Sequence, residues 1–161
     1  MSDNEYGDVR AYHMMCAVQE LLPKAIIRDN DPPRFPPVVS LELVDGSATE
    51  TLSGQNFADW AEFRVTRNGT VSNAIDVYLH TQGTARVGED YELDGASDGR
   101  TVRIPAGLGS VNVRVWVIDD AFFEGDESVS INLVPLPPMG IPYYDVDPEH
   151  SSVTMVIHDN E

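Results

Sequence analysis

The chain has 161 residues, of which 27 are Asp or Glu and 10 are Lys or Arg, so its formal charge at pH 7 is −17. Apolar residues make up 42% of the sequence, enough to bury the core of one domain. A surface this acidic repels nucleic-acid phosphates and anionic lipid headgroups, so we expect no nucleic-acid partner and no direct membrane insertion. The single cysteine excludes an internal disulfide and a cysteine zinc site.

The N-terminal segment differs from the rest of the chain. Its residues 25–30 (AIIRDN) are echoed by residues 155–160 (MVIHDN), an offset of 159 − 29 = 130 residues, which is the length of a small domain. Four prolines within residues 32–37 predict a stiff, extended linker. We therefore predict one domain at residues 34–161. Residues 1–33 would then comprise this linker and, before it, the tail of a preceding repeat or a segment added for expression.

Within residues 34–161, apolar and polar side chains alternate at the two-residue period of a strand. Gly and Pro turns separate these runs, among them Asn68-Gly69, which we interpret as a hairpin turn rather than a glycosylation site. No helical period intrudes, so the sequence predicts an all-β fold, a seven-stranded antiparallel immunoglobulin-like β-sandwich. The seven runs are marked by Val39 to Leu43, Phe63 to Val65, Ile75 to Leu79, Val102 to Ile104, Val111 to Val117, Val129 to Leu133 and Val153 to Ile157.

The densest chemical signal is the stretch Asp119–Glu127, with five carboxylates in nine residues and no Lys or Arg. Two like charges about 4 Å apart repel by roughly 4 kcal/mol at an effective dielectric of about 20, so such crowding needs hydrated side chains or a cation. Alternate connections of a sandwich share an end, so Glu89-Asp90 and Asp159–Glu161 can converge on the same place. Carboxylates and carbonyls without His or Cys describe a hard-cation site, and Ca²⁺ tolerates an irregular oxygen shell.

Three motifs together resemble a Calx-beta domain. They are residues 83–92 (GTARVGEDYE), residues 118–127 (IDDAFFEGDE) and the closing residues 156–160 (VIHDN), and their order and spacing match over about residues 38–161. That family is found in the regulatory region of sodium/calcium exchangers, in an integrin beta subunit and in many extracellular repeat proteins. The resemblance implies a sandwich that, in its calcium-binding members, clusters several Ca²⁺ ions at the end where the next domain attaches.

The resemblance also implies a set of calcium ligands in this chain. They are Glu50, Asp90, Asp119, Asp120, Phe122 through its carbonyl oxygen, Glu124, Glu127, Asp159, Asn160 and Glu161. Asp59 is a rival to Glu50 as the early acidic ligand. Asn160 departs from the family pattern, because it supplies a neutral oxygen where calcium-binding members usually have Asp.

The sequence thus predicts a calcium-binding module that rigidifies or regulates a larger multidomain protein, with adhesion or matrix contact as the favoured setting. Its partners would be neighbouring domains of the same chain and a protein or matrix surface, outside the cell or at its surface. A metal-free structural spacer and an acidic-site glycosidase remain as alternatives. No motif of a serine hydrolase, zinc protease or phosphate-binding loop is present, so we expect no enzymatic activity.

Overall fold

The computed structural model describes residues 36–50, 59–119, 122–135 and 144–160. The chain divides into two units, Met1–Arg34 and Phe35–Glu161, and all described residues lie in the second. The expected repeat tail and linker at residues 1–33 therefore fall outside the described residues. In the described part the strands are β1 (Val38–Asp45), β2 (Ser47–Thr49), β3 (Trp60–Asn68), β4 (Ile75–Gly83), β5 (Tyr91–Asp94), β6 (Ala96–Ser97), β7 (Thr101–Ile104), β8 (Ser110–Val117), β9 (Glu127–Leu133), β10 (Asp145–Val146) and β11 (Ser152–His158), with one short 3-10 helix, η1 (Pro148–His150).

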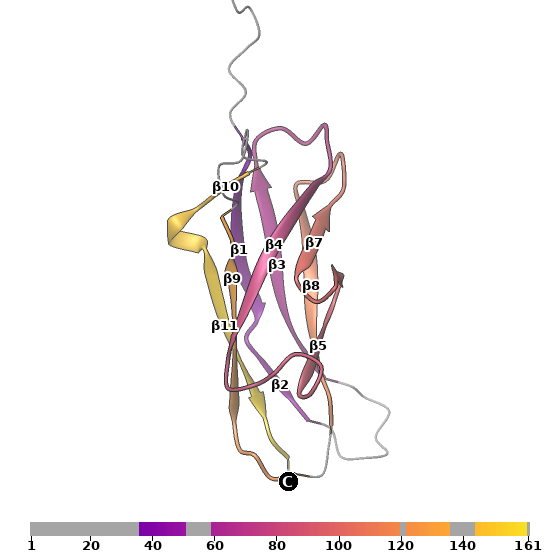
Figure 1. Cartoon of the computed structure of the whole chain (residues 1–161), viewed down its shortest axis with the longest axis vertical. Helices are drawn as coiled ribbons and strands as arrows, with labels where there is room; N and C mark the ends of the chain where they lie inside the picture. Colours follow the sequence, from indigo (N-terminus) through magenta and orange to yellow (C-terminus); the bar gives the residue numbers. More distant parts are fainter. Residues whose placement is uncertain (1–35, 51–58, 120–121, 136–143, 161) are drawn as a thin grey trace, which may run out of the picture. The chain divides into compact units, whose positions relative to one another are not determined.

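The strands form two sheets that lie face to face (Figure 1). The first sheet has the order β10-β1-β3-β8-β5 and the second the order β2-β11-β9-β4-β7-β6. The long pairings are antiparallel, whereas β10 pairs with β1 and β2 pairs with β11 in parallel over short lengths. This arrangement confirms the predicted all-β sandwich. No helix in the described part of the chain is long and apolar enough to cross a membrane.

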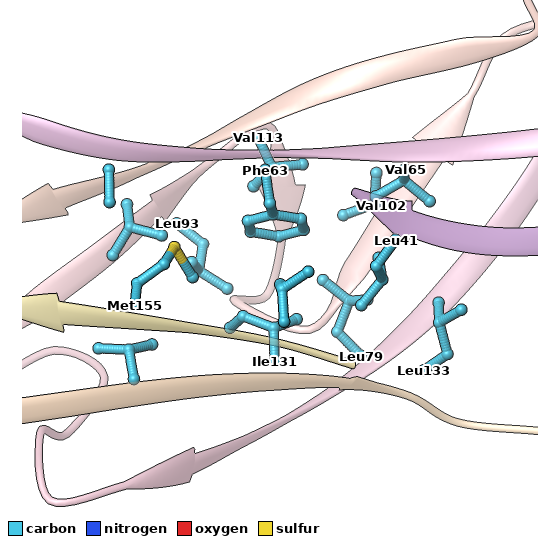
Figure 2. Close-up of a cluster of buried hydrophobic side chains, with 14 of the residues drawn as sticks. Leu41, Phe63, Val65, Leu79, Leu93, Val102, Val113, Ile131, Leu133 and Met155 are labelled. Carbon is cyan, nitrogen blue, oxygen red and sulfur yellow. The ribbon is translucent and has the colours of Figure 1, made fainter. Parts of the chain in front are cut away.

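The alternation of apolar residues places the core between the two sheets. In β3 the side chains of Ala61, Phe63 and Val65 are buried, and the residues between them face outward. Figure 2 shows Phe63 of the first sheet in the same cluster as Ile131 and Met155 of the second. Full burial of one such side chain stabilises the fold by about 1.5–3 kcal/mol. Burial of the apolar side chains in the seven runs is therefore the main source of the stability of the sandwich.

Two features of the strands differ from the sequence-based expectation. The short strands β2, β5, β6 and β10 were not predicted. β2, β6 and β10 have two or three residues each, too few to show a period, whereas β5 does alternate at Tyr91 and Leu93 and was overlooked. The hairpin at Asn68-Gly69 is wrong, because β3 and β4 lie in different sheets and the chain crosses between them. Gly69 has φ +115°, a conformation that L side chains rarely adopt, so this pair ends β3 instead of joining two paired strands.

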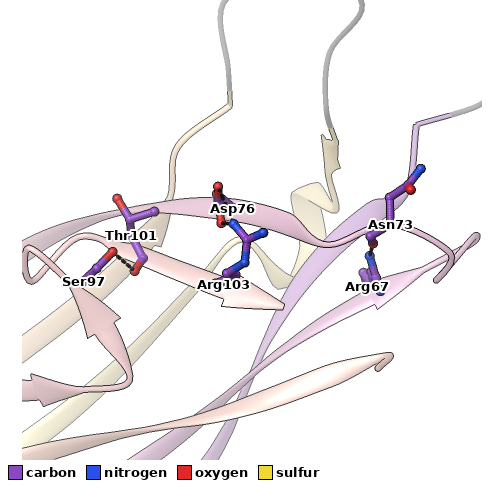
Figure 3. A network of polar contacts seen from close by, with 6 residues as sticks. All are labelled: Arg67, Asn73, Asp76, Ser97, Thr101 and Arg103. Atoms are coloured by element: carbon purple, nitrogen blue, oxygen red, sulfur yellow. Dashed lines mark hydrogen bonds and ion pairs between the residues drawn. The ribbon is translucent and has the colours of Figure 1, made fainter. Parts of the chain in front are cut away.

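Arg67 closes the core at the end of the sandwich where β3 stops. It continues the inward-facing phase of β3 and is only 4% exposed. Its guanidinium donates hydrogen bonds to the backbone carbonyls of Leu108 (2.9 Å), Val71 (3.1 Å), Pro105 (3.0 Å) and Asn73. Figure 3 shows the contact with Asn73. One side chain therefore holds together the connection after β3 and the connection after β7.

Candidate metal centre

The acidic segments meet at the opposite end of the sandwich, the lower end in Figure 1. Asp90 directly precedes β5, and the acidic connection 119–126 joins β8 to β9. The start of β5 pairs with the end of β8, and the start of β9 pairs with the end of β11. These pairings bring Asp90, the acidic connection and residues 159–160 to one place.

Three carboxylates form a cluster there. One carboxylate oxygen from each of Asp90, Glu124 and Glu127 lies within 4.8 Å of the other two. Two oxygens on opposite sides of a Ca²⁺ ion, each about 2.4 Å from it, are about 4.8 Å apart, so the three side chains can reach one cation. Asp90 is fixed by its own loop, because its Oδ2 accepts the backbone N–H of Arg86 at 2.6 Å. The donor set is all oxygen, which suits a hard cation.

The electrostatics of the cluster indicate a shortage of positive charge. Burial raises the pKa of Glu127, and the nearby carboxylates of Asp90 and Glu124 and a hydrogen bond with Asp90 raise it further. Arg86 opposes this shift, but its guanidinium is exposed and pairs with Glu89 (Nη1–Oε2 3.0 Å). In the absence of a metal, a proton on Glu127 therefore relieves part of the repulsion. A divalent cation would replace that proton.

Asp159 ties the end of β11 to the acidic connection. Its Oδ2 accepts the backbone N–H groups of Glu124 and Gly125, each at 2.7 Å. Gly125 has φ +76°, which a glycine adopts without strain and which allows two successive amides to reach one oxygen. His158, one residue earlier, contacts Asp126 of the same connection (Nδ1–Oδ1 3.0 Å). The acidic connection is therefore held against β11 at two points, and Glu124 is positioned by this anchor.

Asp119 and Asn160 contribute buried polar atoms that have no partner. The Oδ1 atom of Asp119 and both the Oδ1 and Nδ2 atoms of Asn160 are buried and make no hydrogen bond with the described residues. The amide of Ile118 donates to the carbonyl of Asp90 at 2.9 Å, which places Asp119 next to Asp90. A buried polar atom left unpaired costs about 1–3 kcal/mol. Both residues lie at the same end of the sandwich as the cluster, although the carboxylate of Asp119 is not among those that come within 4.8 Å of one another.

Glu50 and Asp59 have different surroundings at the same end. The amide of Glu50 donates to the carbonyl of His158 at 3.0 Å, so Glu50 lies beside the segment that leads to Asp159. The two carboxylate oxygens of Asp59 accept the amides of Thr49 and Trp60, each at 2.9 Å. Asp59 therefore fastens the start of β3 to β2, whereas the backbone of Glu50 lies beside the end of β11.

Among the other ligands implied by the resemblance, Asp120 and Glu161 lie outside the described residues, and Phe122 is exposed on the acidic connection. Sequence reasoning missed two residues that shape the site, namely Arg86 and Gly125. Both had a visible signal, because Arg86 is the basic residue nearest to Asp90 in the sequence and Gly125 interrupts a run of acids.

The fold and the site define a class of protein, a β-sandwich domain whose loops assemble a carboxylate centre at one end. The family model of the Calx-beta domain matches residues 49–161. The chain therefore belongs to the Calx-beta domain family. β1 precedes the matched region but pairs with β3 along its length, so the sandwich of this chain begins before residue 49. No curated protein sequence matches the chain significantly.

Three solved structures are similar to this chain. The apo form of the Calx CBD1 domain is 29% identical, with 76% of this chain and 98% of that one covered and a TM-score of 0.49. CBD12 from CALX1.2 is 29% identical, with coverages of 75% and 44% and a TM-score of 0.48. The calcium binding domain CBD12 of CALX1.1 is 30% identical, with coverages of 71% and 42% and a TM-score of 0.43. The chain spans less than half the length of the two CBD12 structures.

Proposed function

We propose that this Calx-beta domain binds Ca²⁺ at the acidic end of its sandwich. One observation carries the proposal: a carboxylate oxygen of each of Asp90, Glu124 and Glu127 lies within 4.8 Å of the other two. The unpartnered buried oxygens of Asp119 and Asn160 support it, because Ca²⁺ takes six to eight oxygen ligands and three carboxylates alone do not fill its shell.

Bound Ca²⁺ would supply the positive charge that the carboxylate cluster lacks. The residues of the chain would bind and position the ion. Asp90 is fixed through the amide of Arg86, and Glu124 is fixed through the contact of its amide with Asp159. Ligation would draw the connection between β8 and β9 toward the start of β5 and stiffen this end of the sandwich. We propose that the domain in this way rigidifies or regulates a larger multidomain protein, in contact with neighbouring domains of the same chain and in an adhesion or matrix setting outside the cell.

A metal-free spacer is the second candidate, and it has an observation in its favour. The carboxylate of Asp159 already accepts two backbone amides. The raised pKa of Glu127 means that this side chain keeps its proton to a higher pH than an ordinary glutamate, which lowers the charge of the cluster in mild acid. On this account the acidic end is stable without a cation and serves as an interaction surface.

Thermal unfolding with and without Ca²⁺ separates the two candidates. At about 100-fold excess over its dissociation constant, Ca²⁺ should stabilise the folded chain by about 2.7 kcal/mol, and Mg²⁺ should do much less. Asp90→Asn and Glu127→Gln should abolish the calcium effect. Glu92→Gln is the matched control, because Glu92 is an exposed carboxylate of β5 only two residues from Asp90. Equal stability in Ca²⁺ and in chelator would support the spacer instead.

A further inference from the structure

β1 has two halves with different surroundings. Its first four residues alternate between outward and buried positions, whereas Glu42–Asp45 are exposed throughout. Leu43 and Val44 are 44% and 46% exposed although both are apolar. On one side this half pairs with β3, with a break in register at Val44, but on the other side β10 reaches only Val38 and Val39, and no other described strand pairs there. The second half of β1 is therefore an open strand edge with uncovered apolar side chains.

The second sheet is also incomplete on this flank. β2 pairs with β11 only at Val156–His158, so the earlier part of β11 has no strand neighbour on that side within the described residues. A surface groove of about 580 Å³ lies between the two edges, lined by residues 40–43 of β1 and by Ser152 and Val153 of β11. The groove is thus bounded by the open edges of both sheets.

The backbone of β1 presents hydrogen-bonding groups to this groove. The amide of Asp147 donates to the carbonyl of Val39 at 2.9 Å on this edge, and the two-residue period places the carbonyls of Leu41 and Leu43 on the same edge. Leu41 is only 3% exposed, so the accessible part of the edge begins at Leu43. An extended segment can add here as a strand, in line with β10.

The negative charge of the groove favours a basic partner. The groove is lined by the carboxylates of Glu42, Asp147 and Glu149 and by the imidazole of His150, and its lining contains no Lys or Arg. Glu42 pairs with Arg64 at 3.2 Å and Asp147 with His150 at 2.9 Å, whereas Glu149 has no ion-pair partner in the described part of the chain. A second copy of this chain, at −17, would bring acid against acid along the edge, so self-pairing is disfavoured.

We propose that the groove beside Glu42–Asp45 is a docking site for an extended, basic segment of a partner protein, which adds to β1 as a strand. Its backbone pairs with Leu43, its apolar side chains cover Leu43 and Val44, and its Lys or Arg side chains contact Glu42 and Glu149. None of these residues belongs to the carboxylate cluster, so the docking site does not depend on bound Ca²⁺.

The test uses the isotope-labelled full chain and a peptide of alternating lysine and valine, in chelator and again in Ca²⁺. We expect NMR shift changes and slowed amide exchange at residues 42–45 and 152–153 under both conditions. A peptide of the same charge with proline in place of each valine should bind at least about tenfold more weakly, because proline cannot donate to a strand ladder. Shifts confined to the acidic connection, or equal binding of the proline peptide, would overturn the proposal.

Charge reversal gives a second, independent readout. The double variant Glu42→Lys and Glu149→Lys should weaken binding of the lysine–valine peptide by about tenfold or more. The matched control is Glu92→Lys with Asp94→Lys in β5, which makes the same charge change on exposed residues at the other edge of the first sheet. If the control weakens binding as much as the groove variant, the peptide is attracted only by the net charge of the chain and no docking site exists. A folded spectrum of each variant is the precondition for the comparison.

Discussion

The two ends of the sandwich differ in whether their polar side chains find partners within the chain. At one end, the guanidinium of Arg67 meets four backbone carbonyls, so the polar groups are satisfied within the chain. At the other end, Glu124 and Glu127 crowd against Asp90, and Asp119 has a buried oxygen without a partner in the described residues. The polar groups of the first end are satisfied, whereas the carboxylates of the second carry more negative charge than Arg86 offsets. The difference indicates that unsatisfied oxygens, rather than the number of acidic residues, distinguish the candidate metal centre from the rest of the acidic surface.

Breaking the satisfied end should have the largest effect. Arg67→Met leaves the carbonyls of two connections without a donor, so the free energy of unfolding should fall by about 3 kcal/mol. Urea denaturation measures this loss. Arg64→Met is the control, because Arg64 lies three residues earlier on the outer face of β3 and its pair with Glu42 is exposed, which predicts a loss under about 1 kcal/mol. Equal losses in the two variants would show that Arg67 does not clamp the loops.

Tyr144 is a second buried polar side chain that is satisfied within the chain, and removing its hydroxyl should have a smaller effect on stability. This buried side chain donates its hydroxyl to the carbonyl of Val134 at 2.7 Å and accepts the amide of Tyr78 at 3.1 Å. Tyr144→Phe keeps the ring but leaves a donor and an acceptor unpaired, so stability should fall by about 2 kcal/mol in urea denaturation. Tyr78→Phe is the matched control, because its side chain is exposed and its amide is retained. A loss below about 0.5 kcal/mol for Tyr144→Phe would contradict the assigned role.

Changing the charge at the acidic end should act on calcium affinity more than on folding. Asp119→Asn removes a ligand charge beside Asp90 and should weaken Ca²⁺ binding about tenfold, or about 1.4 kcal/mol. Asn160→Asp should tighten binding, because an added carboxylate is attracted to the bound cation, and should slightly destabilise the metal-free fold, where only repulsion remains. Calorimetric titration and unfolding in chelator measure the two effects. If Asn160→Asp changes neither quantity, the closing segment does not belong to the centre.

The pH dependence of metal-free stability should reveal two carboxylates of opposite behaviour. Because the pKa of Glu127 is raised above its ordinary value of 4.5, the folded state holds that proton longer, so stability falls as pH rises through the interval above 4.5. The hydrogen bond from His150 and the amide of Glu149 lower the pKa of Asp147 below its ordinary 3.8, so its contribution is lost as pH falls through that lower value. Glu127→Gln and Asp147→Asn should each flatten the profile in its own interval. A profile that Glu127→Gln does not change would contradict the charge shortage.

The fold was largely readable from the sequence because most long strands bury alternate side chains over part of their length. The run of alternating valines at Val111 to Val117 became β8, in which Val113 and Val115 are buried. The short edge strands β2 and β10 escaped notice because each pairs in parallel over a few residues, and such pairing depends on where the neighbouring strand lies. Arg67 was not predicted to be buried. Its signal was present, since it stands two residues after Val65 on the inward-facing phase of β3.

The candidate site was readable only as a set of residues. Asp90, Glu124 and Glu127 were named from motifs, and the structure brings them together. The anchoring of Asp159 by two amides could not be predicted, since it depends on the conformation of Gly125. The unpartnered oxygen of Asp119 could not be predicted either, because burial is a property of the packed fold.

Calorimetric titration of the chelator-treated chain with Ca²⁺ tests the central claim most directly. We expect saturable binding of at least one ion, a tighter response to Ca²⁺ than to Mg²⁺, and loss of that binding in Asp90→Asn, while Glu92→Gln binds as the unaltered chain does. Proton release should accompany binding near the raised pKa of Glu127, because the cation displaces that proton. Absence of binding heat at millimolar Ca²⁺, with unfolding unchanged by chelator, would contradict the account and leave the acidic end as a metal-free surface.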